Sequence, residues 1–331
     1  MPKKHKPRFG SLQFWPRKRA RKVLPSVNWK PLEKKKKEEE KEEGRAGLLG
    51  FIGYKVGMLS AIVKDLTPDS MTRNKKIVLP ATVIECPAMK VLAIRFYKDD
   101  KVATDVLAQG LEKYLQRKIR LPKKEQKVKI EDITNKLNEY SNIRLIVYTL
   151  VKRTGIKKVP DIIEIGLRGT LQEKFDSAKN LLGKEIKIED IFAKGQLTDV
   201  HGITKGKGIA GPVKRFGISL KQHKTEKGVR RPGSLGPWTP KKVSFRVPMA
   251  GQLGFFTRTT YNNKILEINR ISEKNINPSS GFAHYGTIKT SYAIIKGSVQ
   301  GARKNPLILT YPLRARKKKV KENFELLQLE K

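Results

Sequence analysis

Residues 205–260 constrain the fold of this chain more than any other segment, because they hold almost no material for a core. Thirteen lysines and arginines stand there against one acid, Glu226. Ten glycines between 202 and 254, together with five prolines, exclude a continuous helix or strand. A segment this long without its own core is usually functional or disordered inside a compact domain. We therefore predict a long basic loop that projects from a separately folded body.

Trp238 lies in the sequence GPWTP, residues 236–240, in the middle of this loop. A tryptophan is ordinarily a core residue, and the sequence leaves that alternative open. The prolines on either side brace the turn, and the surrounding residues offer the ring little core to enter. A large exposed ring on a cationic projection is well suited to stacking on nucleic-acid bases.

The letters GKGIAG at residues 206–211 match the glycine pattern of dinucleotide-binding sites, with Glu226 twenty residues after Gly206. Such a site needs its glycines to open a helix whose first turn meets the pyrophosphate. Here Pro212 follows at once, and a run rich in glycine, proline and lysine takes the place of the helix. We interpret these glycines as letting the backbone approach phosphates closely, and we expect no nucleotide cofactor.

Catalytic and metal-binding residue types are few. Asp199 and His201 would share one face of a strand, the spacing of an oriented general base, but no nucleophile stands nearby. We interpret His201 as a structural or phosphate-contacting residue. The single cysteine, Cys86, excludes an internal disulfide and a thiolate-rich zinc site. We expect no enzymatic activity, no metal, no cofactor and no small-molecule substrate.

The first 32 residues carry ten lysines and arginines and no acid, with Phe9, Phe14, Trp15 and Trp29 among them. Such a segment cannot bury enough apolar surface to fold alone, so a plain disordered tail is one interpretation. The interleaved rings favour another, in which the segment orders on a partner as cations meet phosphates and rings stack on unpaired bases. Residues 33–43 are nearly all charged, which is typical of a solvated linker or a short exposed helix.

The whole chain has 72 lysines and arginines against 31 acids, a formal net charge of +41 over 331 residues. A chain this basic repels itself and attracts polyanions, which excludes an ordinary neutral enzyme as the default class. No stretch reaches the ~20 apolar residues of a membrane span, and the N-terminus lacks the apolar stretch of a secretory signal. We expect a soluble, intracellular protein with a polyanionic partner and no membrane contact.

The remaining segments predict a mainly β fold. Short β-branched runs typical of strands occur at 48–60, 77–84 and 91–97, before a region with both helical and strand patterns. Further runs typical of strands occur at 264–271, 287–295 and 307–311. In the mixed region, 105–118 and 131–140 have helical spacing, and Thr170 with Glu173 predicts a capping box. Because closure removes exposed strand edges, we expect one closed antiparallel β-barrel interrupted by an α+β insertion.

This reading divides the chain into five parts. Residues 1–45 form a basic N-terminal extension with its charged linker, and 46–99 form the first part of the barrel. Residues 100–195 are the inserted α+β module, 196–313 are the second part of the barrel with the basic loop 205–260, and 314–331 are a basic C-terminal tail.

Four separated motifs give this chain a resemblance to a known family. They are PKKHKPRFGSLQFWPRKRA at 2–20, GFIGYKVGM at 50–58, DVHGITKGKGIAGPVKRFG at 199–217 and PMAGQLGFFTRT at 248–259. Together they resemble ribosomal protein uL3 of the large subunit in its archaeal/eukaryotic form. The resemblance covers nearly the whole chain, and the tryptophan within GPWTP favours the archaeal type over the bacterial one.

The resemblance implies a translation-protein-like barrel, an extended N-terminal tail embedded in rRNA, and a long basic finger that reaches toward the peptidyl transferase centre. It implies a structural, non-enzymatic constituent of the cytoplasmic ribosome that binds 23S-type large-subunit rRNA. It further implies support of early subunit assembly, tuning of A-site tRNA accommodation by the tryptophan-tipped finger, and neighbours such as uL14 and eL24.

The motifs and the basic segments together predict the RNA-binding residues. They are Arg8, Phe14, Trp15, Arg17, Lys18, Arg19, Arg21, His201, Lys205, Lys207, Lys214, Arg215, Lys221, His223, Lys224, Lys227, Arg230, Arg231, Trp238, Lys241, Lys242, Arg246, Gln252 and Arg258.

One position departs from the eukaryotic pattern. Where eukaryotic relatives have a histidine that can be methylated, this chain has Glu226, so that modification does not carry over. A second function stays open at this point: a transient RNA chaperone or assembly factor that leaves before the subunit matures.

Overall fold

The computed structural model describes residues 10–34, 47–122, 133–134, 136–239 and 241–330. Its contacts divide the chain into two units. The smaller unit comprises residues 1–22 and 203–258, and the larger comprises 23–202 and 259–331. Among the described residues, no helix is long and apolar enough to cross a membrane.

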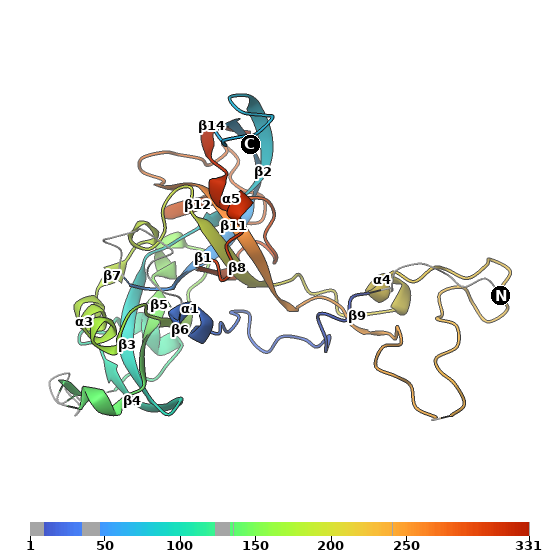
Figure 1. Cartoon of the computed structure of the whole chain (residues 1–331), viewed down its shortest axis with the longest axis horizontal. Coiled ribbons are helices and arrows are strands. Elements are labelled where there is room, and N and C mark those ends of the chain that lie inside the picture. Colours follow the sequence, from blue (N-terminus) through green and yellow to red (C-terminus); the bar gives the residue numbers. More distant parts are fainter. Residues whose placement is uncertain (1–9, 35–46, 123–132, 135, 240, 331) are drawn as a thin grey trace. The chain divides into compact units, whose positions relative to one another are not determined.

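A seven-stranded sheet in the order β13-β8-β11-β12-β2-β1-β14 dominates the larger unit (Figure 1). β1 is the longest strand, and its sequence alternates small glycines with β-branched and aromatic side chains that are buried over most of its length. The strands are β1 (Gly50–Asp65), β2 (Lys76–Glu85), β8 (Leu197–Ile203), β11 (Thr257–Arg270), β12 (Ser291–Lys296), β13 (Pro306–Thr310) and β14 (Phe324–Glu330).

The pairing in this sheet returns to its starting strand. β13 pairs with β8 and also with β1, where Phe51 lies opposite Leu309 and Gly53 opposite Leu307. A Cβ atom at Gly53 would lie 2.5 Å from Ile84 Cγ2, so the close packing of β1 on β2 needs a glycine there. The predicted mainly β fold is confirmed, with its strands in several sheets.

A second sheet, in the order β4-β3-β5-β6 with β7 beside β3, forms the other layer of the larger unit. Its strands are β3 (Met89–Lys98), β4 (Lys101–Leu107), β5 (Asn142–Thr149), β6 (Ile162–Gly166) and β7 (Glu185–Ile186), and α3 (Leu171–Leu181) packs against β5. α3 begins with the predicted capping box, in which the Thr170 hydroxyl accepts from the Glu173 backbone N–H and the Glu173 carboxylate accepts from the Thr170 N–H.

Two sequence-based predictions differ from the structure. β3 was expected in the first part of the barrel but pairs with β4 and β5, because a short apolar run does not reveal which sheet it joins. The helix expected over 105–118 is wrong, since β4 continues to Leu107 and only the 3₁₀ turn η2 (Lys113–Arg117) follows. Within the expected helix over 131–140, the structure shows the 3₁₀ turn η3 (Leu137–Glu139). The further 3₁₀ turns are η4 (Val151–Thr154) and η5 (Ile188–Asp190).

Both ends of the larger unit are tied into its folded body. Trp29 and Leu32, at the short helix α1 (Lys30–Glu33), are buried, and Glu33 forms an ion pair of 2.8 Å with Arg144 on β5. The Trp29 ring is therefore not placed to stack on bases. At the other end, the basic segment leads through α5 (Lys317–Lys321) into β14, which pairs with β1.

The smaller unit has little regular structure, as its glycine and proline content predicts. Its elements are β9 (Ile209–Ala210), β10 (Gly251–Gln252) and α4 (Pro212–Phe216). β9 pairs with β10 at the base of the loop, and no helix or strand is found in the described residues between 217 and 250. Few apolar side chains among its described residues are buried, and the largest of them are Phe216 and Phe256.

Removing the carboxylate of Glu85 should destabilise the larger unit. Glu85 is fully buried at the end of β2, and it accepts from the Tyr285 hydroxyl, the Lys289 and Thr290 N–H groups and the Thr290 hydroxyl. Hydrogen bonds to charged groups contribute ~1.5–3 kcal/mol each, and buried donors left without an acceptor cost a similar amount. We expect Glu85→Ala to lower the free energy of unfolding by ~3 kcal/mol or more, measured by urea denaturation.

Glu189 is the control for this measurement, because its carboxylate is 35% exposed and forms an ion pair with Arg270 near the surface. We expect Glu189→Ala to change the free energy of unfolding by less than ~1 kcal/mol. Equal effects of the two substitutions would contradict the role given to Glu85.

Candidate nucleic-acid interface

Arg215 organises the base of the basic loop from the end of α4. Its Nε donates to the Gln252 carbonyl at 3.0 Å, and its Nη1 donates to the Met249 carbonyl at 2.9 Å. These bonds join α4 to the returning chain at β10. Gln252 adds a bond from its Nε2 to the Gly254 carbonyl at 3.0 Å. At Gly254, where φ is +71°, a Cβ atom would lie 2.0 Å from the Lys205 carbonyl oxygen. Only glycine therefore allows the outgoing segment at Lys205 and the returning segment at Gly254 to lie this close.

The N-terminal segment packs on this base through aromatic and cationic side chains. The Trp15 ring stacks on Phe216 with centroids 6.1 Å apart and meets the edge of Phe245 at 5.6 Å. The Arg17 guanidinium lies 4.3 Å from the Phe216 ring centroid, and its Nη1 donates to the Arg215 carbonyl at 2.7 Å. Trp15 and Arg17 thus contact other side chains of the protein and are half-buried.

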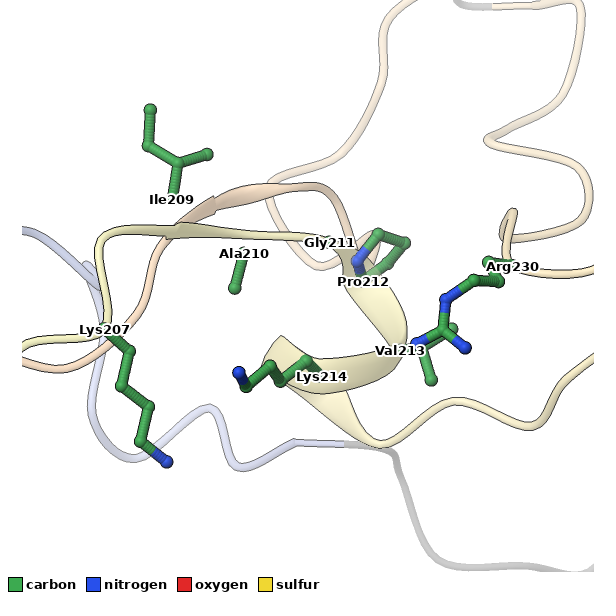
Figure 2. A pocket seen from close by; sticks show the side chains of 8 residues that line it. All are labelled: Lys207, Ile209, Ala210, Gly211, Pro212, Val213, Lys214 and Arg230. Carbon is green, nitrogen blue, oxygen red and sulfur yellow. The ribbon is translucent and has the colours of Figure 1, made fainter.

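A pocket of ≈ 290 Å³ opens beside β9 and α4 (Figure 2). Lys207, Lys214 and Arg230 bring three cations to it from separate parts of the loop, and Gly211 and Pro212 form part of its wall. No carboxylate is among its lining residues. The glycine-rich motif therefore opens a helix of only five residues with Pro212 at its start, within a cationic hollow. This arrangement suits an anionic group such as a phosphate better than a dinucleotide.

The predicted cations of the outer loop and N-terminal segment are mostly exposed. Those with exposed side chains are Lys18, Arg19, Arg21, Lys205, Lys207, Lys214, Lys221, His223, Lys224, Lys227, Arg230, Arg231, Lys241, Lys242 and Arg246. The half-buried predicted residues are Trp15, Arg17, Arg215, Gln252 and Arg258, and Arg8 lies outside the described residues. The Arg258 guanidinium lies 4.4 Å from the Phe14 ring centroid, and burial lowers its pKa.

The Trp238 side chain is 83% exposed, which decides between the two alternatives that the sequence left open. It is not a core residue. Its ring meets a cation of the same turn, with Lys241 Nζ 5.3 Å from the ring centroid. An aromatic face of this size next to a cation is the combination that single-stranded nucleic acids use for stacking and phosphate contact.

The two units differ in how their basic side chains are paired with carboxylates. In the second sheet of the larger unit, Arg144 pairs with both Glu33 and Glu164, and Arg95 pairs with Asp105 at 2.8 Å. In residues 205–260, Glu226 is the single carboxylate for thirteen cations. The smaller unit therefore presents uncompensated positive charge that needs a polyanion close by.

The comparisons with known proteins agree with this geometry. The family model for Ribosomal protein L3 matches residues 1–329. The large ribosomal subunit protein uL3 of Methanocaldococcus jannaschii is 40% identical over 326 residues, covering 96% of this chain and 94% of that protein. The uL3 of Archaeoglobus fulgidus is 41% identical over 311 residues, covering 90% of this chain and 89% of that protein. The chain belongs to the ribosomal protein L3 family.

The predicted resemblance to uL3 of archaeal type is thereby confirmed. As a member of the L3 family, the chain is a structural constituent of the large ribosomal subunit and not an enzyme, and rRNA binding follows from the family.

His201 lies in the larger unit, on β8, and differs in character from the cations of the loop. Its Nε2 is 3.1 Å from the Thr310 hydroxyl and its Nδ1 is 3.0 Å from the Thr259 hydroxyl. Burial lowers its pKa to about 4, so the ring is neutral at physiological pH. Its neighbour Asp199 accepts from the Asn262 and Leu313 N–H groups, and the two residues do not contact each other as a catalytic pair would. The role predicted for His201 at RNA is thus that of a neutral hydrogen-bonding group.

Sequence reasoning missed Phe245. Its side chain is 64% exposed, it contacts Trp15, and the Arg246 guanidinium lies 5.8 Å from its ring centroid. The signal was present in the sequence, because an aromatic residue among cations in a segment without a core is the pattern that singled out Trp15 and Trp238. We add Phe245 to the predicted RNA-contacting residues.

The affinity of the protein for rRNA fragments should fall steeply with salt, because the exposed cations meet phosphates. The logarithm of the association constant is expected to fall with the logarithm of salt concentration by ~0.7–0.9 per phosphate neutralised. Replacing Lys221, Lys224 and Lys227 together by alanine should reduce the slope by ~2–3. Filter binding across a salt series measures it.

The control replaces three exposed lysines of the larger unit, Lys113, Lys118 and Lys179, by alanine. We expect this variant to keep the wild-type slope. A salt response that is flat in the wild-type protein, or unchanged in the loop variant, would contradict a phosphate-directed interface.

His201 should make the stability of the larger unit depend on pH. Its folded pKa of about 4 lies below the unfolded value of about 6.5, so protons bind the unfolded chain preferentially. Its contribution is therefore complete above pH ~6.5 and is lost as the pH falls toward ~4. We expect the free energy of unfolding to decline more between these pH values in the wild-type protein than in His201→Gln, measured by urea denaturation. Parallel pH profiles would contradict the neutral, buried assignment.

Proposed function

We propose that this chain binds large-subunit rRNA chiefly through its N-terminal extension and residues 205–260, and that residues 205–260 form a finger tipped by Trp238 that reaches toward the peptidyl transferase centre. There it would tune how tRNA settles in the A site. The observation that carries this proposal is the 83% exposure of Trp238 at a turn among exposed cations, in a unit with almost no core. A ring left in water on a cationic projection is suited to contact with RNA.

The proposed rRNA contacts fall into two sets by what the side chains already do. Exposed cations such as Lys221, Lys224 and Lys227 are free of the core and suited to phosphates. Trp15, Arg17 and Arg215 instead hold the N-terminal segment against the loop base, and we infer that they shape the surface that RNA meets.

We further propose that the pairing path through β1, β2, β12, β11, β8 and β13 is the closed barrel expected from the sequence. The pairing of β13 with both β8 and β1 supports it. A closed barrel has no free edges, and it would carry the basic loop as a connection between β8 and β11. The division into an N-terminal extension, a barrel with an inserted module and a basic C-terminal tail, with β3 assigned to the second sheet, is part of the same proposal. So are the neighbours uL14 and eL24 and a role in early subunit assembly.

The sequence alone left open a transient RNA chaperone or assembly factor, and membership of the L3 family favours the resident protein. Sedimentation of the tagged protein in cell extract, before and after a high-salt wash, separates the two. Retention with mature large subunits and polysomes supports the resident role. Appearance only in precursor particles, or release into the top fractions, would favour the transient factor.

Replacing Trp238 by alanine should leave the fold intact and impair tRNA accommodation. The ring has no core contacts to lose, so we expect the free energy of unfolding to change by less than ~0.5 kcal/mol. Subunits that contain Trp238→Ala should show a reduced rate of aminoacyl-tRNA accommodation, measured by rapid kinetics with labelled tRNA.

Trp29 supplies the matched control, because it is only 2% exposed and packs against Gly50. We expect Trp29→Ala to lower the free energy of unfolding by ~3–5 kcal/mol. A loss of this size in Trp238→Ala would show that its ring belongs to a core, and wild-type accommodation kinetics would contradict the proposed role of the finger.

A further inference from the structure

One face of the larger unit shows apolar side chains where an antiparallel sheet usually turns polar ones to solvent. We call this surface the β14 face, and it lies on the paired strands β1, β2 and β14 (Figure 1). Its exposed apolar side chains are Met58 (44%), Val78 (60%) and Leu327 (43%). The half-buried Ile62 lies between them, paired with Val78 on β2 and with Gln328 on β14.

On the opposite face of the same strands, the apolar side chains pack into the core. Ile77, Leu79 and Leu326 on that side pack against the cluster around Phe282 and Tyr285. The alternation along the strands thus places one set of apolar residues in the core and a second set in solvent. Exposed apolar side chains on three neighbouring strands, with Val78 and Gln328 on either side of Ile62, favour an interaction site more than single scattered residues do.

β14 also offers a strand edge. It pairs with β1 on one side, and no other strand in the described part of the chain pairs with its second side. Its sequence, FELLQLE, contains neither the proline nor the lysine that commonly protects such an edge. The register shifts at Ile62 and Val63, which leaves Leu327 as the extra residue of a β-bulge. Bulges re-aim a side chain, and here the exposed side chain is apolar.

The charge of the β14 face differs from that of the basic loop 205–260. Residues 322–330, between Lys321 and Lys331, contain three glutamates and no cation, and Glu322 forms an ion pair of 2.8 Å with Lys296 on β12. Lys64 and Lys76 lie in the same row as Glu325 and offset it, whereas Glu330 shares its row with the uncharged Ser60 and Pro80. A carboxylate repels phosphates and attracts lysine or arginine, so the surface favours a protein partner over RNA.

We propose that the β14 face is the docking surface for another protein of the large subunit, which lays an apolar segment over Leu327 and Val78 and sets a lysine or arginine beside Glu330. This inference rests on the proposed function, because it takes the assembled subunit as the setting. An apolar centre with a charged rim is the usual anatomy of a specific protein interface.

The test places a reactive thiol on the face. The native Cys86 is buried, and burial raises its pKa, so Leu327→Cys supplies the reactive thiol of the described chain. Val78→Cys gives a second, independent probe should the first variant fold poorly. Each full-length variant is labelled with a fluorescent maleimide, once as free protein and once in large subunits purified from cells in which it replaces the wild-type chain. A maleimide–benzophenone reagent on the free protein, reconstituted into subunits, then identifies what covers the thiol.

We expect labelling at either position to slow at least tenfold in the subunit and the photo-crosslink to join the chain to a second protein. A crosslink to rRNA would overturn the proposal in favour of RNA, and labelling at the free-protein rate would overturn it in favour of an open surface. If the variant chains, like the wild-type chain, fail to sediment with large subunits, the proposed function itself has failed. If they sediment normally and only the face is open or covered by RNA, the docking inference alone has failed.

Glu330→Lys in the Leu327→Cys background tests the charge complementarity. Reversal should raise the labelling rate in the subunit at least threefold, because a lysine now faces the partner's cation. The control is Asp176→Lys on α3, an exposed acid on a different element, which should leave that rate unchanged. An unchanged rate in Glu330→Lys would overturn the basic character assigned to the partner.

Discussion

Repulsion among cations is the constraint on which the rest of this structure depends. The larger unit meets it internally, since Arg144 and Arg95 lie between Glu33, Glu164 and Asp105 on the surface of one sheet. The smaller unit cannot do so with one carboxylate in residues 205–260. It is held instead by interactions that need no acid: arginine N–H groups on carbonyls and guanidinium groups over aromatic rings.

That solution explains why the half-buried cations among the described residues of the smaller unit are all arginines. Arg215 and Arg17 have planar donors that can satisfy several carbonyls and rings at once, and they are the ones drawn into the base. Lys221, Lys224 and Lys227 have a compact charge on a flexible stem, and they stay exposed. The half-buried arginines therefore build the shape of the unit, and its lysines and exposed arginines supply the charge that a polyanion meets.

The sequence predicted the mainly β body, the capping box at Thr170 and the exposed state of the basic loop, because each depends on local residue types. It could not assign β3 to the second sheet, since the strand's apolar run fits either sheet and only its partners decide. Nor could it separate Trp29 from Trp15 and Trp238, three tryptophans in basic, proline-containing segments. Trp29 is buried because glycines at 50 and 166 leave room for its ring, a contact between residues far apart in the chain.

The same logic separates the surfaces that face RNA from those that do not. In a chain with a net charge of +41, a basic patch carries little information about the partner, because cations are everywhere. The informative surface is the exception: the strand β14, where glutamates and exposed leucine replace lysine. Carboxylates repel phosphates, so glutamates beside exposed apolar side chains indicate that something other than RNA lies against this strand. Departure from the prevailing charge is therefore the better guide to a protein neighbour.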